Sequence, residues 1–262
     1  MALLQFGDEG ARRIERVYAT PDVVRQREQV LELLQPAVGE EILDVGSGPG
    51  FLLRSIAEAV GPAGSARGLE PSAAMNAMAQ ARCADVAWVG LDEGNAEALP
   101  YSAASFDAVV STQVYEYVAD VLGALVEVRR VLRPGGRVVV LDTDWDSVVW
   151  HATDRERHRR VMAAWEEHLV DARLPRTLPG LLERAGFRVV ERRLIPVFNP
   201  VYDEDTYSAG TIDTIGAFVT GRHGLTDDDV ARWAADLRSR GTDYLFSLNR
   251  YCFVATATGE PP

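Results

Sequence analysis

A glycine-rich stretch between a short apolar run and a predicted helix is the first part of the sequence that could do chemistry. Residues 44–50 read DVGSGPG, so three glycines and a proline fall within five residues. Glycine destabilises regular structure beside it, so its density here needs a compensating use. Backbone without side chains can approach a ligand closely, and the following helix offers unpaired N–H groups to an electron-rich group. The stretch therefore predicts a ligand-binding loop.

The spacing of the glycines limits the class of ligand. A dinucleotide-binding loop has the pattern G-x-G-x-x-G, and Phe51 stands where its third glycine belongs. A phosphate-binding P-loop is excluded because no G-K-S or G-K-T follows. The leading hypothesis is that the loop binds a nucleoside without phosphates. The weaker alternative is that it binds a nicotinamide dinucleotide in an oxidoreductase.

Three further segments favour a nucleoside. Glu70 follows a predicted strand and begins the run EPS, and its carboxylate can accept hydrogen bonds from both ribose hydroxyls. Residues 94–100 read GNAEALP after the next strand, where Asn95 could hold an adenine edge. Residues 132–137 read LRPGGR and predict a tight turn before another strand. Each segment alone is a weak signal, but their order and spacing together are specific.

With these segments, residues 40–144 resemble the class I S-adenosylmethionine-dependent methyltransferases, in particular the group with a UbiE/type-11-like core. The resemblance implies an α/β fold with a Rossmann-like, seven-stranded, mostly parallel sheet, and S-adenosyl-L-methionine as the cofactor. One departure is Asn95, where the family usually has Asp, although an amide oxygen can still accept from the adenine amino group. The matching stretches are LDVGSGPG at 43–50, EPS at 70–72, GNAEALP at 94–100, FD at 106–107 and LRPGG at 132–136.

The resemblance also implies a set of cofactor-binding residues. The glycine loop would line the methionine part, Glu70 would bind the ribose, Asn95 and Ala96 would hold the adenine, and residues 111–113 would border the sulfonium. Arg27 joins them because a guanidinium on the apolar face of a predicted helix suits the cofactor carboxylate. The full set is Arg27, Asp44, Gly46, Ser47, Gly48, Gly50, Glu70, Pro71, Ser72, Met75, Gly94, Asn95, Ala96, Ser111 and Thr112.

Residues 142–151, DTDWDSVVWH, emerge from the end of a predicted strand, where a methyl acceptor would lie. Asp144 and His151 are candidate bases that could remove a proton from the acceptor, and Trp145 is a candidate wall. The alternative is a capped helix start with core tryptophans. Gln113 is the third catalytic candidate because it follows a strand that ends at the same site, and packing is its alternative role. The remaining candidate acceptor contacts are Tyr18, Tyr115, Phe198, Tyr202 and Tyr207.

Alternating strand and helix patterns position these residues in a parallel sheet with right-handed crossovers. We expect strands at 41–45, 66–69, 86–89, 106–111, 137–142, 187–194 and 244–256. We expect helices at 21–34, 51–60, 71–82, 121–132, 154–170, 178–185, 203–220 and 226–238. Without a Pro-, Gly- or Ser-rich linker, the sequence predicts one domain over 1–262. Its parts are an N-terminal helical lid at 1–35, a cofactor-binding core at 36–144, and substrate-side helices with the last two strands at 145–262.

The composition narrows the classes of partner. The formal net charge is −12 and the chain contains no lysine, which excludes a Schiff-base lysine and argues against nonspecific nucleic-acid binding. Cys83 and Cys252 are expected to be buried apolar side chains, which fits a reducing cytoplasm. No cluster of potential metal ligands has ligand spacing, and no apolar run is long enough for a membrane span. His158 is expected in the core, and His168 and His223 at the surface.

The sequence thus predicts methyl transfer from S-adenosyl-L-methionine to a nitrogen, oxygen or carbon atom of a small molecule, in bacterial specialised metabolism. The product would be S-adenosyl-L-homocysteine, and the protein a monomer or homodimer. Such a displacement requires nucleophile, methyl and sulfur to be collinear in a water-poor pocket. The alternatives are a cyclase, pericyclase or binding protein that uses the same cofactor without transfer, and a tRNA or protein methyltransferase, which the acidity disfavours.

Overall fold

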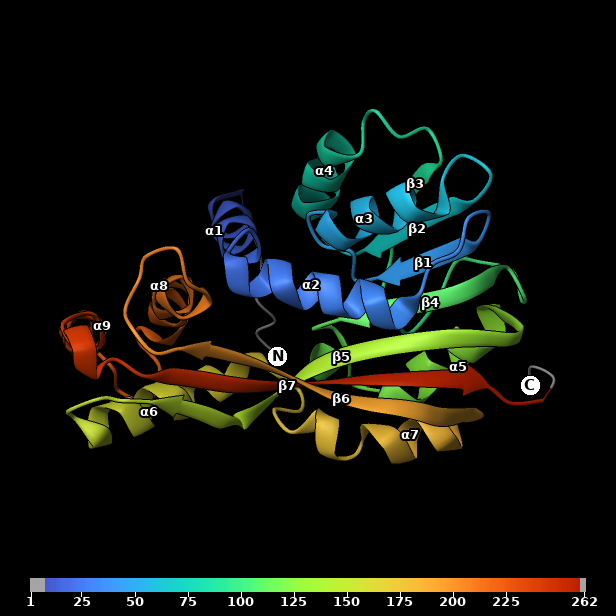
Figure 1. The fold of residues 1–262 in the computed structure, drawn as a ribbon. Helices are drawn as coiled ribbons and strands as arrows, with labels where there is room; N and C mark the ends of the chain where they lie inside the picture. The colour runs from blue at the N-terminus through green and yellow to red at the C-terminus, as the bar shows by residue number, and fades with distance from the viewer. Residues whose placement is uncertain (1–7, 260–262) are drawn as a thin grey trace.

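One mixed sheet runs through residues 8–259, the part of the chain that the computed structural model describes. Its seven strands in this range have the order β3-β2-β1-β4-β5-β7-β6 (Figure 1). Pairing is parallel except for β7, which is antiparallel to both β5 and β6. The expected Rossmann-like, mostly parallel sheet is therefore confirmed. The strands are β1 (Glu41–Val45), β2 (Ser65–Glu70), β3 (Val89–Glu93), β4 (Phe106–Thr112), β5 (Leu132–Trp150), β6 (Phe187–Asn199) and β7 (Phe246–Ala257).

The strand order reverses at β1, and this reversal positions the glycine loop. Strand β1 pairs with β2 on one side and with β4 on the other, so that Asp44 lies opposite both Gly68 and Val110. In open parallel sheets, ligands bind outside the carboxyl ends of the strands at such a reversal. The loop that follows β1 therefore begins in the crevice where a ligand is expected.

Helices cover both faces of the sheet (Figure 1). On one face, α2 and α3 pack against the sheet with side chains such as Leu34 and Ile56. On the other face, α5 and α7 contribute Leu125 and Leu182 to a second apolar cluster. The helices are α1 (Asp8–Tyr18), α2 (Pro21–Leu34), α3 (Phe51–Val60), α4 (Ala73–Arg82), α5 (Val121–Val131), α6 (Arg155–Trp165), α7 (Leu178–Arg184), α8 (Tyr207–Val219) and α9 (Asp227–Arg238).

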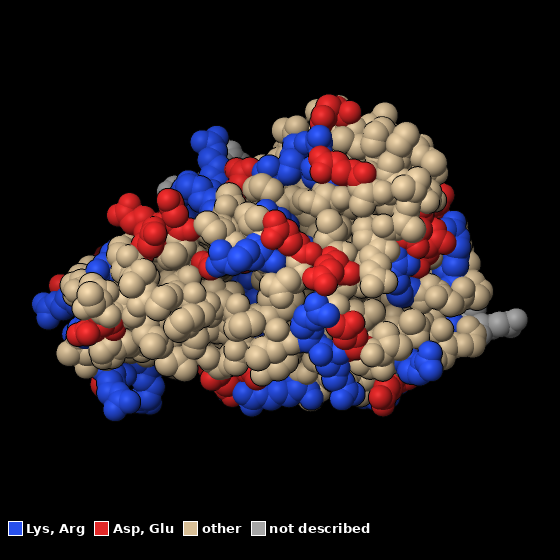
Figure 2. Space-filling model, in the orientation of Figure 1, with Lys and Arg blue, Asp and Glu red and all other residues tan. Residues whose placement is uncertain are grey.

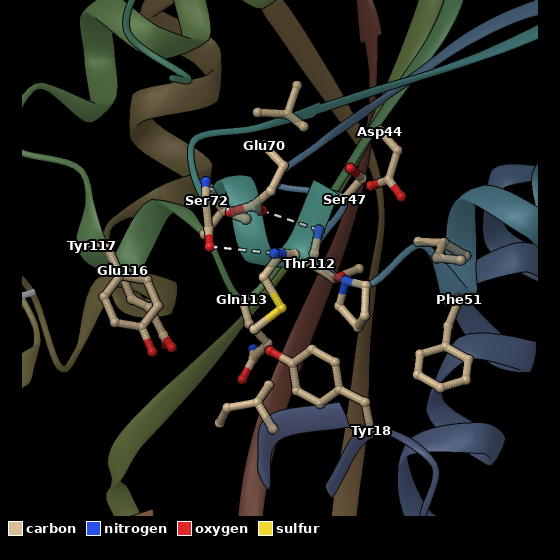
Figure 3. Close-up of a pocket in the computed structure, with 18 of the residues that line it drawn as sticks. Tyr18, Asp44, Ser47, Phe51, Glu70, Ser72, Thr112, Gln113, Glu116 and Tyr117 are labelled. Carbon is tan, nitrogen blue, oxygen red and sulfur yellow. Dashed lines mark hydrogen bonds between the residues drawn. The ribbon is translucent and has the colours of Figure 1, made fainter. Parts of the chain in front are cut away.

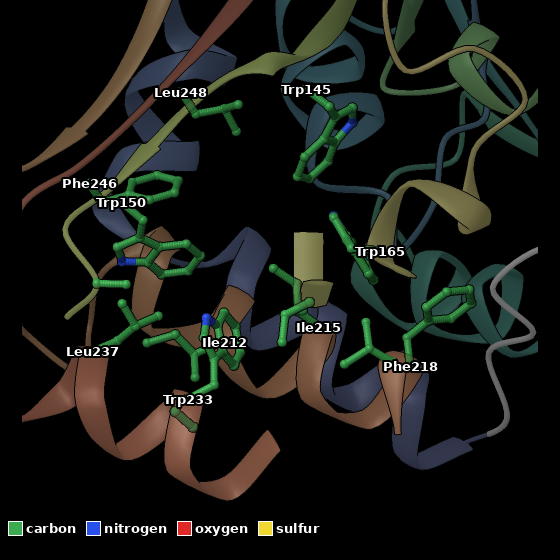
Figure 4. Packing of buried hydrophobic residues seen from close by; sticks show 14 of the residues in the cluster. Trp145, Trp150, Trp165, Ile212, Ile215, Phe218, Trp233, Leu237, Phe246 and Leu248 are labelled. Atoms are coloured by element: carbon green, nitrogen blue, oxygen red, sulfur yellow. The ribbon is translucent and has the colours of Figure 1, made fainter. Parts of the chain in front are cut away.

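The last three strands of the sheet extend toward α6, α8 and α9, at the left of Figure 1. Strand β5 has 19 residues whereas β1 has 5, so β5 reaches well beyond the end of β1. A third apolar cluster packs on this extension. Trp150 anchors that cluster, with its ring centroid 4.7 Å from Phe246 and 5.8 Å from Trp233 (Figure 4). The C-terminal half thus adds a packed wall beside the parallel part of the sheet.

The extension corrects the prediction that strand structure ends at residue 142. Strand β5 continues to Trp150 because its last residues pair antiparallel with β7, after a register shift that begins at Asp144. The residues expected to start a helix or loop therefore lie in a sheet, and α6 is shorter than the predicted helix at 154–170. A partner strand about a hundred positions downstream supplies the hydrogen bonds that local sequence does not reveal.

Two further differences concern element boundaries. The third strand begins at Val89 instead of residue 86, because the Val86 N–H donates to the Cys83 carbonyl oxygen (2.9 Å) and prolongs the turn after α4. Helix α1 lies within the predicted helical lid at 1–35, although the sequence pattern gave it no bounds of its own; its Val17 side chain is buried against α8 residues.

Charged side chains of both signs are interspersed on the face shown in Figure 2. This arrangement offers no extended basic surface there for nucleic acid. Both cysteines are buried, as expected. None of the helices between residues 8 and 259 has the length and apolar character that crossing a membrane requires.

Candidate functional site

A cavity of about 720 Å³ lies at the carboxyl ends of β1, β2 and β4, and α1, α2 and α8 contribute further walls. Its volume is within the range of small-molecule sites, roughly 300–1,000 Å³. Most of the predicted site residues line it: Tyr18, Arg27, Asp44, Gly46, Ser47, Gly48, Glu70, Pro71, Ser72, Met75, Gly94, Asn95, Ala96, Thr112, Gln113, Trp145 and Tyr207. The predicted residues outside the lining are Gly50, Ser111, Tyr115, Asp144, His151, Phe198 and Tyr202.

The glycines of the loop have different physical roles. Gly46 has a φ of +72°, and a Cβ there would lie 2.2 Å from the Val114 Cγ2 atom, so no side chain fits. Gly48 has a φ of +52° and lines the pocket with bare backbone. Gly50 instead lets α3 approach α4, since a Cβ would lie 2.8 Å from that of Ala79. Gly50 lies outside the pocket lining, and its lack of a side chain serves helix packing.

Asp44 is a buried carboxylate without a partner in the described residues. Its side chain is 1% exposed, lines the pocket, and neither oxygen accepts a hydrogen bond. Burial, aided by the nearby charge of Glu70, raises the pKa of Asp44 to about 8. A buried polar group without a partner is costly, so a ligand that donates hydrogen bonds here would be stabilised.

Glu70 is held in place by backbone N–H groups on both of its oxygens (Figure 3). Gly48 donates to one oxygen (3.1 Å) and Ser72 donates to the other (3.0 Å). Burial raises the pKa of Glu70, and these two hydrogen bonds oppose the rise. Each carboxylate oxygen keeps a lone pair, so Glu70 can still accept from two vicinal hydroxyls.

Asn95 is arranged differently from the prediction. Its side-chain oxygen accepts from the N–H groups of Glu97 (3.0 Å) and Ala98 (3.1 Å), which caps the turn after β3. The oxygen expected to accept from adenine is therefore already used. The amide NH₂ of Asn95 remains as a donor for a ring nitrogen.

Glu116 is a site residue that the sequence prediction did not include. It is 1% exposed, lines the pocket, and lies with Tyr117 on the opposite side from Asp44 and Ser47 (Figure 3). Its carboxylate accepts from the Thr143 N–H and the Trp145 Nε1–H, both at 3.3 Å. Burial raises the pKa of Glu116 to about 7, against the lowering effect of these bonds. Its position just after β4 was the signal available in the sequence.

The two predicted bases with ionisable side chains lie outside the pocket lining. Asp144 accepts two hydrogen bonds from the Arg176 guanidinium (2.8 and 3.0 Å), so its carboxylate forms a structural ion pair. His151 is exposed, and its Nδ1 lies 2.7 Å from the Asp243 carbonyl oxygen. Adjacent residues on a strand face opposite sides, so Trp145 lines the pocket and Asp144 does not; His151 follows the end of β5 at Trp150 and also lies outside the lining.

Gln113 does reach the pocket, in a strained conformation with a φ of +59°. Its Oε1 accepts from the Thr143 hydroxyl (2.5 Å), and its Nε2 is buried without a partner among the described residues. An amide does not take up a proton at neutral pH, so Gln113 is not a base. Its geometry suits it to donate a hydrogen bond to a ligand.

Four other predictions place side chains in the site that lie elsewhere. Tyr115 is fully buried in the cluster under α5, and Ser111 is completely buried within β4. Phe198 is 56% exposed because it faces away from the core of β6. Tyr202 packs on Tyr244, with ring centroids 5.6 Å apart. These four residues contribute to packing or to the surface.

Histidine placement differs from the prediction at one position. His158 is half-buried and accepts from the Trp233 Nε1–H (3.1 Å), which agrees with a packed histidine. His168 is expected at the surface but is 2% exposed and stacked on Trp165 at 3.6 Å. Burial lowers the pKa of His168 to about 4. Trp165 lines the pocket beside Trp145 (Figure 4), so His168 supports an aromatic wall.

The sheet order, the bare loop after β1 and the acid at the end of β2 define a Rossmann-like fold with a candidate ligand site at the carboxyl ends of its strands. Residues 43–140 match the family described as a methyltransferase domain. This segment of the chain thus carries a domain of the class I S-adenosylmethionine-dependent methyltransferase type. Within residues 8–259, no group of three or more His, Cys, Asp or Glu side chains is arranged to hold a metal ion.

Similar proteins agree with this family. An uncharacterized 37.1 kDa protein in transposon TN4556 of Streptomyces fradiae is 37% identical over 177 residues, which cover 65% of this chain and 50% of that protein. The demethylmenaquinone methyltransferase of Lactococcus lactis is 36% identical over 119 residues, 45% of this chain and 47% of the relative. The solved structure of a proposed methyltransferase from Bacillus halodurans has a TM-score of 0.65 at 16% identity, covering 90% of this chain and all of that one. The chain spans about half the length of these curated relatives.

Proposed function

We propose that this protein binds S-adenosyl-L-methionine and transfers its methyl group to a small-molecule acceptor. One observation carries the proposal: a partnerless Asp44 carboxylate and a backbone-tethered Glu70 carboxylate line the same pocket, joined by the bare Gly46–Gly48 backbone. An ammonium group would satisfy Asp44, and a ribose diol would satisfy Glu70. Both groups belong to this cofactor, which when bound supplies an electrophilic methyl group on a sulfonium.

The described residues account for the rest of a cofactor site. The amide NH₂ of Asn95 and the Ala96 backbone would hold the adenine at the end of β3. Thr112 and Gln113, directly after β4, would border the sulfonium. Tyr18 of α1 would close the pocket over the junction between cofactor and acceptor. In this arrangement the helices and the sheet would enclose the reacting atoms and exclude water from them.

We assign the role of base to Glu116. It lines the acceptor side of the pocket, and no metal-ligating cluster is present there in the described chain. Since its pKa is about 7, it is partly ionised at neutral pH and can accept a proton from a nucleophile. Three hydrogen-bonding groups around its carboxylate would stabilise the side chain in position during that transfer.

The helices α1 and α2 would act as a lid within the predicted N-terminal part at 1–35. Arg82 of α4 joins α1 to the loop, because it pairs with Glu15 (2.5 Å) and donates to the Pro49 carbonyl oxygen (2.8 Å). Arg82 also lies 3.5 Å above the Phe51 ring centroid. The division into this lid, a core at 36–144 and a substrate side at 145–262 is part of the proposal.

The first test is calorimetric titration with S-adenosylmethionine and S-adenosylhomocysteine. Failure of both ligands to bind would remove the proposal. The second test incubates the protein with the cofactor and a panel of bacterial specialised metabolites, and measures S-adenosylhomocysteine by mass spectrometry. Conversion of a substrate with the cofactor left intact would instead favour a cyclase or pericyclase. Transfer to tRNA or protein alone would replace the small-molecule acceptor.

A further inference from the structure

Arg250 of β7 is a buried cation in the pocket wall with no ion-pair partner in the described chain. Its side chain is 3% exposed and lines the cavity. One guanidinium nitrogen donates to the Gln26 Oε1 atom, the guanidinium carbon lies 4.5 Å from the Tyr207 ring centroid, and Nε has no partner. A neutral amide and an aromatic face only partly offset the cost of burying a permanent charge. The Glu116 carboxylate is near enough to feel this charge but forms no ion pair with it, so an anionic ligand group would supply the direct pair that Arg250 lacks.

A second unpartnered donor lies along the same row. Arg250 is the cross-strand partner of Thr143 in the β5–β7 ladder, and the Thr143 hydroxyl bonds to Gln113. Cross-strand partners share a face of the sheet, so Arg250 and Gln113 flank Thr143. The Gln113 Nε2 group is also buried without a partner among residues 8–259. Two unsatisfied donors in one row favour a ligand oxygen that carries negative charge.

The cofactor carboxylate has another cation nearer to its expected position. Arg27 lines the pocket beside the glycine loop, 4.6 Å from the Phe51 ring centroid. Arg250 instead pairs across the ladder with Thr143, whose N–H donates to the Glu116 carboxylate, so it lies on the Glu116 side of the pocket. Three aromatic side chains also line the pocket: Tyr117, Trp145 and Trp165.

We propose that the methyl acceptor is an aromatic carboxylic acid whose carboxylate is bound by Arg250 and whose ring lies against Trp145 and Trp165. This inference rests on the proposed function and specifies its acceptor. The carboxylate fixes one end of the molecule, and Glu116 stands ready to accept a proton from the nucleophile. An uncharged analogue would leave the Arg250 cation buried and unpaired, so charge on the acceptor determines specificity.

The test compares acids with their uncharged amides on the intact protein saturated with S-adenosylhomocysteine. The probes are benzoate, 4-hydroxybenzoate and 4-hydroxycinnamate, each titrated beside its amide and followed by tryptophan fluorescence. At least one acid should bind the wild type tenfold or more tightly than its amide. Arg250→Met should bring that acid and amide within twofold of each other. If no acid is preferred by the wild type, the inference is overturned without reference to any variant.

Two cofactor ligands separate the possible sources of the anion. S-adenosylhomocysteine carries a carboxylate, whereas 5′-methylthioadenosine lacks the amino-acid portion. Arg250→Met should change the affinity for both less than twofold. Selective weakening of S-adenosylhomocysteine would assign Arg250 to the cofactor and overturn the inference while leaving the proposed function intact. Absence of S-adenosylhomocysteine binding by the wild type would instead reject the proposed function.

Discussion

Cofactor binding is expected to release a proton from Asp44. In the ligand-free protein, burial holds the pKa of this carboxyl at about 8 instead of its ordinary 3.8. At about pH 6.5 the group is then roughly 97% protonated, because the pH lies about 1.5 units below the pKa. A ligand ammonium placed against it favours the carboxylate and lowers the pKa. Binding at this pH should therefore expel close to one proton.

The measurement is calorimetric titration of S-adenosylhomocysteine in two buffers that differ in ionisation enthalpy. If about one proton is released, the observed binding enthalpies in phosphate and in Tris should differ by about the difference between the ionisation enthalpies of the two buffers. Affinity should rise by about tenfold per pH unit between about pH 5 and 7, since each unit makes the proton easier to lose. Asp44→Asn is the matched control, because it keeps the shape but cannot release a proton.

Identical enthalpies in the two buffers for the wild type would refute this reasoning, and so would equal proton release by Asp44→Asn. The ligand-free protein provides an independent readout. A raised pKa in the folded state means that the stability contribution is fully present below the unfolded pKa and is lost as the pH rises through the folded value. The melting temperature should therefore fall between about pH 4 and 8 in the wild type, and fall less in Asp44→Asn.

Three further predictions concern the loop and the candidate bases. Gly46→Ala should lower both cofactor affinity and melting temperature, because its Cβ would lie 2.2 Å from a Val114 methyl group. The double variant Gly46→Ala/Val114→Ala should recover part of this loss. If it recovers nothing, the Gly46–Val114 contact is not the cause. Asp144→Asn and His151→Ala should leave the turnover number within about twofold, because neither side chain lines the pocket; a large loss in either would return it to the list of bases. The turnover number of the wild type should rise as the pH increases through about 7. Glu116→Gln should be slow, and its turnover number should not show that rise. If the variant keeps the wild-type pH profile, Glu116 is not the base.

The cofactor end of the site was predictable because its signals are local. The glycines at 46 and 48 need left-handed backbone in a loop directly after a strand, and a run of seven residues is enough to display this. Glu70 follows from the same logic, since the ends of adjacent parallel strands meet at one edge of a sheet. Gly50 and Ser111 lie outside the lining; the Gly50 contact with Ala79 depends on how α3 packs against α4, which no local pattern records.

The acceptor end was less predictable because it is built by long-range pairing. The sequence correctly marks the end of the fifth strand as important, yet adjacent residues on a strand point to opposite faces. Trp145 therefore reaches the pocket, whereas Asp144 pairs with Arg176 outside the lining. The choice between them is set by a register shift in the ladder with β7, which no local pattern records.

Arg250, on the partner strand β7, could not be predicted from local sequence either. In the sequence it is one arginine in an apolar C-terminal run, without a neighbouring motif to mark it. Only its pairing with Thr143 brings it beside Gln113 and into the wall that contains Glu116. The residues proposed to bind the cofactor are thus encoded by local patterns, whereas those that would select the acceptor depend on strand register. Substitutions that shift the β5–β7 register should consequently alter acceptor affinity more than cofactor affinity.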